Sequence, residues 1–410
     1  MKTWANTLID KYRTFIPQVS ATAFLVLLAA LPYPLPFIRV CWMIWIISWL
    51  AELRFLSVRK IRLSRGMVYL SIGITVWFIW NMVSVIWAAD KQIAWSYVWR
   101  YVCMLAIPFV GMFGVNEYYD WHKCLKVLFL SCLISIGVYM FTHYWVINHA
   151  FAMDKHNISP IPVDWFHMDN LLLDIKHRMH YTNILCMLFP CLVLSYRKIG
   201  FLPSFAIGIV LLIAIFFTGS RIALVNLITI AMISLCYYLL RGRKRWLKAI
   251  VVCSALAIWV AGVITVTALH PRNTGLNEPR LAIWQTAVEQ PKDYLAYGLG
   301  AGNSTEYLVE HYRQHGWYEH TICRYSAHNQ VLGVCMELGL TAAVLFVLFW
   351  FGMPFFFKGA QRYWVLCVLG IVFPVMMTDM LLSGLEGIHF LIVMSVLGII
   401  YRTNPSNTVS

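Results

Sequence analysis

A histidine at the entry to an apolar run is the residue best suited to acid–base chemistry in this sequence. His328 and Asn329 end a polar stretch and open the apolar run 328–352. A neutral imidazole is the natural general base near pH 7. The alternative is a polar residue that serves only the structure at the edge of the run. We predict His328 as the catalytic base, with Asn329 in support and the preceding basic loop available to hold a charged leaving group.

Two arginines at predicted helix N-termini are candidates for binding an anion. Arg221 follows Ser220 in the segment Thr218-Gly-Ser-Arg221 and opens the apolar run 221–240. Backbone N–H groups at a helix N-terminus favour negative charge, which an adjacent arginine reinforces. Arg280 begins a helix predicted over 280–289, where its charge opposes the helix dipole unless an anion compensates it. The alternative for Arg221 is a side chain that extends to the lipid headgroups.

Three further charged residues are secondary candidates. Glu337 lies about two and a half turns into the run that His328 opens, so we expect this intramembrane carboxylate to have a partner and a structural role. Arg324 and Arg178 are loop or helix-end charges that would support a site. Histidine and aspartate residues gather in 148–177, but none has the spacing of a known metal motif. We therefore predict neither a metal nor another cofactor.

Composition identifies the elements that must position these residues. Of 410 residues, 60% are apolar and only 12% are charged, which excludes a soluble globular domain and a disordered chain. A membrane-spanning helix needs about 20 apolar residues. The expected fold is an all-α polytopic membrane protein of about twelve spans, at about 21–37, 39–56, 67–87, 96–114, 124–147, 178–196, 201–217, 221–240, 247–268, 328–352, 362–380 and 385–401.

The net charge of +14 mainly indicates how the chain is oriented in the membrane. Placing both termini in the cytoplasm puts most basic residues on inner loops, including the dense groups at 54–65 and 241–248, as the positive-inside rule requires. We therefore predict no nucleic-acid partner.

This topology divides the chain into an N-terminal membrane region at 1–268, an outer loop cap at 269–327 and a C-terminal membrane region at 328–410. A second outer loop covers 148–177. The cap is expected to hold the helix at 280–289, a glycine-rich turn at 297–302, and a helix that starts at a capping box formed by Asn303 and Glu306.

The order of these motifs resembles the O-antigen ligase family, whose members share a C-terminal module with Wzy-type O-antigen polymerases. The resemblance covers about 215–345 and rests on Thr218-Gly-Ser-Arg221, Arg280-Leu-Ala-Ile-Trp284, Gly298-Leu-Gly300, Ala327-His-Asn329 and Glu337-Leu-Gly339. It implies a glycosyltransferase of GT-C type in the bacterial inner membrane, with its active site facing the periplasm. The donor would be a polysaccharide on undecaprenyl pyrophosphate, and the acceptor a sugar of lipid A–core.

Carried over by motif, His328 would be the base, and Arg221 and Arg280 would bind the diphosphate without a metal or nucleotide. The guanidinium fork suits phosphate oxygens, and direct displacement would invert the anomeric centre. The alternatives are a Wzy-type polymerase and, less favoured, a transporter. Polymerases are often described with a glycine eleven residues after an arginine in two outer loops, but here Pro291 and Phe189 follow Arg280 and Arg178 at that spacing. The long outer loop and the lack of a half-to-half repeat disfavour the transporter.

Overall fold

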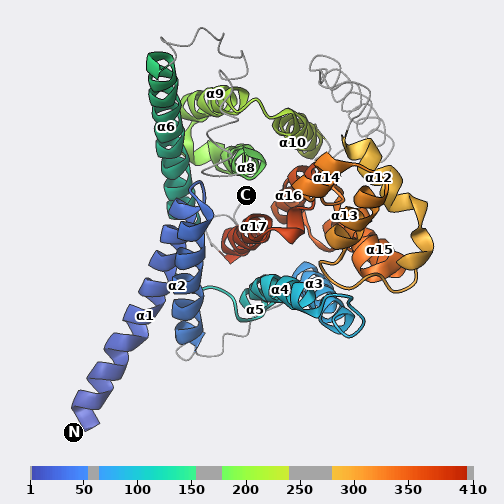
Figure 1. Ribbon diagram of the computed structural model, residues 1–410. Coiled ribbons are helices and arrows are strands. Elements are labelled where there is room, and N and C mark those ends of the chain that lie inside the picture. Colours follow the sequence, from blue (N-terminus) through green and yellow to red (C-terminus); the bar gives the residue numbers. More distant parts are fainter. Residues whose placement is uncertain (1, 54–63, 154–177, 240–278, 404–410) are drawn as a thin grey trace. The chain divides into compact units, whose positions relative to one another are not determined.

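The computed structural model describes residues 2–53, 64–153, 178–239 and 279–403. All regular elements in these ranges are helices (Figure 1). Nine of the described helices are long and apolar enough to cross a membrane, and Phe15–Ala30 and Phe201–Phe217 are shorter apolar helices. The described part is therefore that of a multi-pass helical membrane protein. The predicted span at 247–268 and most of the loop 148–177 lie outside the described residues.

Contacts divide the chain into two compact units, each assembled from separate stretches of sequence. The first comprises Met1–Arg62, Phe113–Ile230 and Ser395–Ser410, and the second comprises Leu63–Met112 and Ala231–Met394. The helices α10 (Arg221–Leu239) and α17 (Leu385–Thr403), and α5 (Ala106–Phe113) by its last residue Phe113, each have residues in both units.

The first unit is built on a helical hairpin. It holds α1 (Lys2–Ala30), α2 (Leu35–Leu53), α6 (Trp121–Met153), α8 (Arg178–Ile199) and α9 (Phe201–Phe217). Pro32 and Pro34 in the short connection 31–34 fit the sharp reversal between α1 and α2, because proline removes a backbone donor and fixes φ. The hydroxyl of Tyr119 joins both helices, at 2.6 Å from Ser20 Oγ and 3.0 Å from Trp45 Nε1. The chain is helical from Lys2 onwards.

The second unit contains the membrane helices around His328. These are α3 (Arg65–Ser84), α4 (Lys91–Val102), α5 (Ala106–Phe113), α15 (Gln330–Phe356) and α16 (Gly359–Met376), with short 3-10 turns η1 (Cys103–Leu105) and η5 (Leu381–Ser383). Helices α3 and α15 pack closely: Tyr69 stacks on Phe349 and Phe356 with ring centroids 5.5 and 4.1 Å apart. Gly73 leaves the space that the ring of Phe349 fills.

A small helical cap belongs to this same unit. It consists of α12 (Pro279–Glu289), η4 (Pro291–Asp293), α13 (Ser304–Gln314) and α14 (Tyr318–Cys323). Both predicted cap helices are confirmed. The capping box is wrong, because Asn303 makes no side-chain cap bond to α13. Its amide instead pairs with the backbone of Asp90, accepting from the N–H at 2.9 Å and donating to the carbonyl at 3.3 Å, so it ties the cap to the start of α4.

The glycine-rich turn fastens the cap to a break in α15. Gly339 has φ 87° and ψ 169°, which interrupts the helix and frees backbone groups. The segment 295–300 pairs with these groups: Leu299 N–H donates to the Met336 carbonyl at 2.8 Å, and Leu340 N–H donates to the Leu295 carbonyl at 2.9 Å. At Gly298, which has φ 78°, a Cβ would lie 2.3 Å from the carbonyl of Glu337. Only glycine permits this approach.

Candidate functional site

His328 lies between the cap and the membrane helices, in a backbone conformation that favours glycine. It has φ 44°, in the left-handed region that costs a residue with a Cβ about 1–2 kcal/mol. Strain of this kind persists where surrounding contacts impose it, and it gathers at functional sites. Asn329, the next residue, is extended and caps α15: its Oδ1 accepts a hydrogen bond from Leu332 N–H at 3.0 Å. Asn329 therefore fixes where the helix begins, directly after His328.

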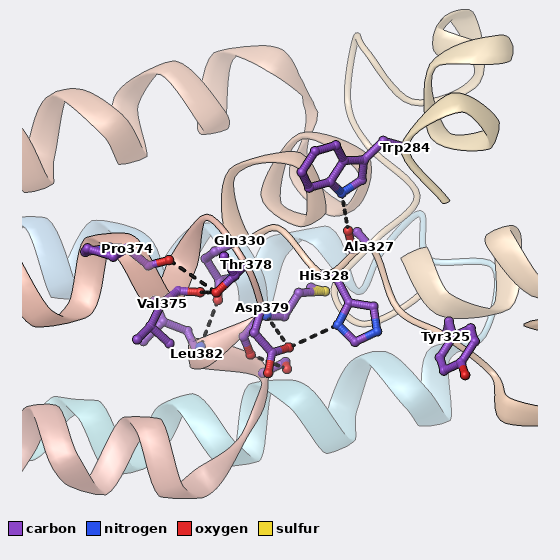
Figure 2. A network of polar contacts seen from close by, with 12 residues as sticks. Trp284, Tyr325, Ala327, His328, Gln330, Pro374, Val375, Thr378, Asp379 and Leu382 are labelled. Atoms are coloured by element: carbon purple, nitrogen blue, oxygen red, sulfur yellow. Dashed lines mark hydrogen bonds and ion pairs between the residues drawn. The ribbon is translucent and has the colours of Figure 1, made fainter. Parts of the chain in front are cut away.

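The imidazole of His328 faces a carboxylate that sequence reasoning did not select. Its Nδ1 lies 3.5 Å from Oδ1 of Asp379, and the side chains are 29% and 30% exposed (Figure 2). Asp379 follows α16 in the short connection to η5. Its Oδ1 also accepts a hydrogen bond from Met380 N–H at 2.7 Å, which orients the carboxylate.

This arrangement suits general base catalysis at Nε2 of His328. A carboxylate at Nδ1 selects the tautomer that leaves Nε2 free to accept a proton. It also stabilises the imidazolium that forms when the proton arrives. Both side chains are partly exposed, so a substrate hydroxyl has access to the pair.

The cap contacts the backbone next to His328 through Trp284, and its residue Tyr325 lies near the imidazole. The indole N–H of Trp284 in α12 donates to the carbonyl of Ala327 at 3.0 Å (Figure 2). The ring of Tyr325 lies 5.9 Å from that of His328. Arg280 lies one turn before Trp284 in α12 and is partly exposed. The helix that carries Arg280 is thus anchored next to His328.

The cap has polar contacts of its own that keep its helices together. Tyr307 of α13 donates to Oδ2 of Asp293 at 2.9 Å. Burial, together with this carboxylate, raises the pKa of Tyr307, so the phenol keeps its proton and remains a donor. Arg324, in the left-handed conformation with φ 50°, forms an ion pair with Glu306 across α13 and α14. Arg324, predicted as a supporting residue, therefore joins two parts of the cap.

Glu337 has the partner that an intramembrane carboxylate requires. It is buried in α15, and Ser304 Oγ, at the start of α13, donates to its Oε1 at 2.7 Å. This contact links α15 to the cap.

Arg221, Ser220 and Arg178 lie in the first unit. Arg221 is the first residue of α10 and is partly exposed. Ser220 is buried, and its Oγ accepts from Ala223 N–H at 3.4 Å, as an N-cap does. Arg178 begins α8, but its side chain lies outside the described set. The structure thus groups His328, Asn329, Arg280, Arg324 and Glu337 in the second unit and describes the other three candidates in the first.

In the described ranges, no group of three or more His, Cys, Asp or Glu side chains is arranged to hold a metal ion. The two cap histidines that share a helix face have other contacts: His315 Nε2 lies 3.1 Å from Glu289 Oε2, and His311 Nδ1 lies 2.9 Å from the Tyr307 carbonyl.

The chain also matches a known protein family. Residues 206–347 match the family model described as O-antigen ligase (Wzy_C). No curated protein matches the chain in a sequence comparison. The matched segment includes Arg221, Arg280 and His328, and ends before Asp379. Over residues 206–347, the chain is therefore similar to the O-antigen ligase family.

Proposed function

We propose that this protein transfers a glycan from a lipid diphosphate donor to a hydroxyl group of an acceptor sugar. The observation that carries the proposal is the pairing of His328 with Asp379, because His328 lies inside the O-antigen ligase match. The proposed donor is a polysaccharide on undecaprenyl pyrophosphate. The proposed acceptor is a sugar of lipid A–core in lipopolysaccharide biosynthesis.

The reaction is a single displacement at the anomeric carbon. The acceptor hydroxyl approaches Nε2 of His328, which takes the proton as the oxygen attacks. The new C–O bond forms while the bond from the anomeric carbon to the diphosphate oxygen breaks, and the electron pair leaves with undecaprenyl pyrophosphate. Asp379 stabilises the positive charge on His328. Displacement of this kind inverts the anomeric configuration, and a base in this position contributes about 10²–10⁴-fold.

The leaving diphosphate needs positive charge, which fixed cations supply. Arg280 and Arg221 are the proposed ligands, because both lie in the first turn of a helix, where the N-terminal N–H groups favour anions. Arginine offers two parallel donors to phosphate oxygens, which lysine does not. No nucleotide is required, since the donor glycan already carries its leaving group.

The proposed setting is the bacterial inner membrane. The nine described candidate spans are consistent with a GT-C-type enzyme of about twelve spans. We propose cytoplasmic termini, and a cap and active site that face the periplasm, because the densest basic stretches fall on the predicted inner loops.

A deletion strain tests the proposed function. Loss of the gene should leave lipid A–core without long polysaccharide, while long lipid-linked polymer accumulates. The wild-type gene should restore the long chains, and a His328→Ala gene expressed at the same level should not. If no long lipid-linked polymer forms in the deletion strain, the protein is a Wzy-type polymerase. Uptake of substrate into proteoliposomes without glycosyl transfer would indicate a transporter instead.

A further inference from the structure

The segment that carries Asp379 is fastened from outside by two side chains that the proposed reaction does not itself use. The backbone of Asp379 is bonded to the end of α16, because the Asp379 N–H donates to the Val375 carbonyl at 2.8 Å. After Asp379 the backbone turns through η5, where the N–H and hydroxyl of Ser383 donate to the Met380 carbonyl at 3.1 and 2.6 Å. Two side chains from other elements also bond to this stretch.

Gln330 supplies the first of these contacts. Its Oε1 accepts a hydrogen bond from Leu382 N–H at 2.8 Å, and the side chain is almost completely buried (Figure 2). Gln330 is the first residue of α15, two positions after His328. One buried amide therefore links the segment of the base directly to the segment of its carboxylate. A hydrogen bond in a buried setting holds its geometry because the alternative is an unpaired polar group.

Arg100 supplies the second contact, from a third element. Its guanidinium, in α4, donates through Nη1 to the carbonyl of Ser383 at 2.8 Å. The same guanidinium lies over the ring of Tyr97, 4.5 Å from the centroid, which fixes its direction. A charged side chain within a membrane-spanning helix is costly and tends to be functional. Here Arg100 holds the carbonyl of Ser383, four residues after Asp379.

We propose that Gln330 and Arg100 are positioning residues that hold Asp379 against His328. The inference rests on the proposed function, because it assigns these side chains to the same reaction. Neither residue needs to contact substrate. Each fixes the backbone three or four residues beyond Asp379, and removal of either contact frees the carboxylate to move away from Nδ1. Misplacement by about 1 Å in such a pair costs on the order of 10²-fold in rate.

The test uses purified full-length protein in proteoliposomes, with lipid-linked glycan and lipid A–core extracted from the deletion strain. Arg100→Met and Gln330→Met remove the hydrogen bonds at similar side-chain length. Each should lower kcat about ten- to a hundredfold while KM for the donor stays within about twofold. Arg100→Lys keeps one donor and the charge, so it should recover part of the loss. Arg313→Met is the matched control, because that arginine is exposed and pairs with Glu310 on α13.

A double-mutant cycle separates positioning from general damage. In an Asp379→Asn background, adding Arg100→Met or Gln330→Met should change kcat by less than about twofold, since the carboxylate that they position is already lost. Equal factors in the wild-type and Asp379→Asn backgrounds would overturn the proposal. So would wild-type kcat in both methionine variants. Absence of transfer by the wild-type protein would instead refute the proposed function itself.

Discussion

Removing the charge of Asp379 should slow glycosyl transfer without unfolding the protein. Asp379→Asn keeps the size of the side chain and an oxygen that accepts from Met380 N–H, which Oδ1 now does at 2.7 Å. It removes the negative charge 3.5 Å from Nδ1 of His328. The imidazolium that forms during the attack then lacks its counter-charge, and the tautomer with Nε2 free loses its preference. The expected change is a lower kcat at nearly constant KM.

The size of the effect follows from distance and exposure. Unit charges 3.5 Å apart interact by about 1.2 kcal/mol in bulk water and about 4.7 kcal/mol at an effective dielectric constant of about 20. The side chains of His328 and Asp379 are 29% and 30% exposed, so the interaction energy of the pair falls between these two values. A loss of about 1.5–4 kcal/mol in the transition state corresponds to a fall in kcat of about 10- to 1,000-fold.

The assay is the initial rate of glycan transfer to lipid A–core by reconstituted protein, followed by gel mobility of the product. Asp293→Asn is the control: it removes a carboxylate that accepts from Tyr307 in the same unit, and it should keep the wild-type rate. A wild-type kcat in Asp379→Asn would refute the role of this carboxylate. A similar fall in Asp293→Asn would show that the loss comes from disturbance of the cap.

Three further substitutions probe the cap and its junction with the membrane helices. Gly298→Ala places a Cβ 2.3 Å from the carbonyl of Glu337, so the thermal unfolding midpoint in detergent should fall by several degrees; an unchanged midpoint would contradict the close approach. Trp284→Phe removes the donor to the Ala327 carbonyl, which should lower transfer about three- to tenfold, and an unchanged rate would exclude that anchor. Arg280→Lys keeps the charge and loses the two-pronged contact with phosphate; donor KM should rise at least about tenfold, and full activity would remove Arg280 from the diphosphate site.

Helix positions were predictable because apolar length and breaking residues determine them. The runs 67–87, 201–217 and 385–401 correspond to α3 at Arg65–Ser84, α9 at Phe201–Phe217 and α17 at Leu385–Thr403. Pro279 and Pro291 delimit the cap helix in the way proline does. The break in α15 at Gly339 was not predicted, because a glycine within an apolar run is compatible with an unbroken helix and does not by itself indicate a positive φ.

The candidate site was only partly predictable, since its pairs are joined by folding across long stretches of sequence. His328 was selected from its place at the end of a polar loop, whereas Asp379 lies 51 positions later at the end of a different apolar run. The available signal was a lone acid in that run, and Arg100 was a lone base in another. Asn303 is an opposite case, in which a local pattern predicted a helix cap that does not form. Its side chain instead accepts a hydrogen bond from the backbone N–H of Asp90, which is distant in sequence.

The most direct test is single-turnover transfer by reconstituted wild-type and His328→Ala protein, with donor binding measured in parallel. We expect wild-type protein to join the glycan to lipid A–core and to release undecaprenyl pyrophosphate. We expect His328→Ala to bind the donor as well as wild type and to transfer it at least about 10²-fold more slowly. Equal rates in the two proteins, or extension of the lipid-linked glycan in place of transfer to lipid A–core, would contradict the proposed roles of His328 and of the protein.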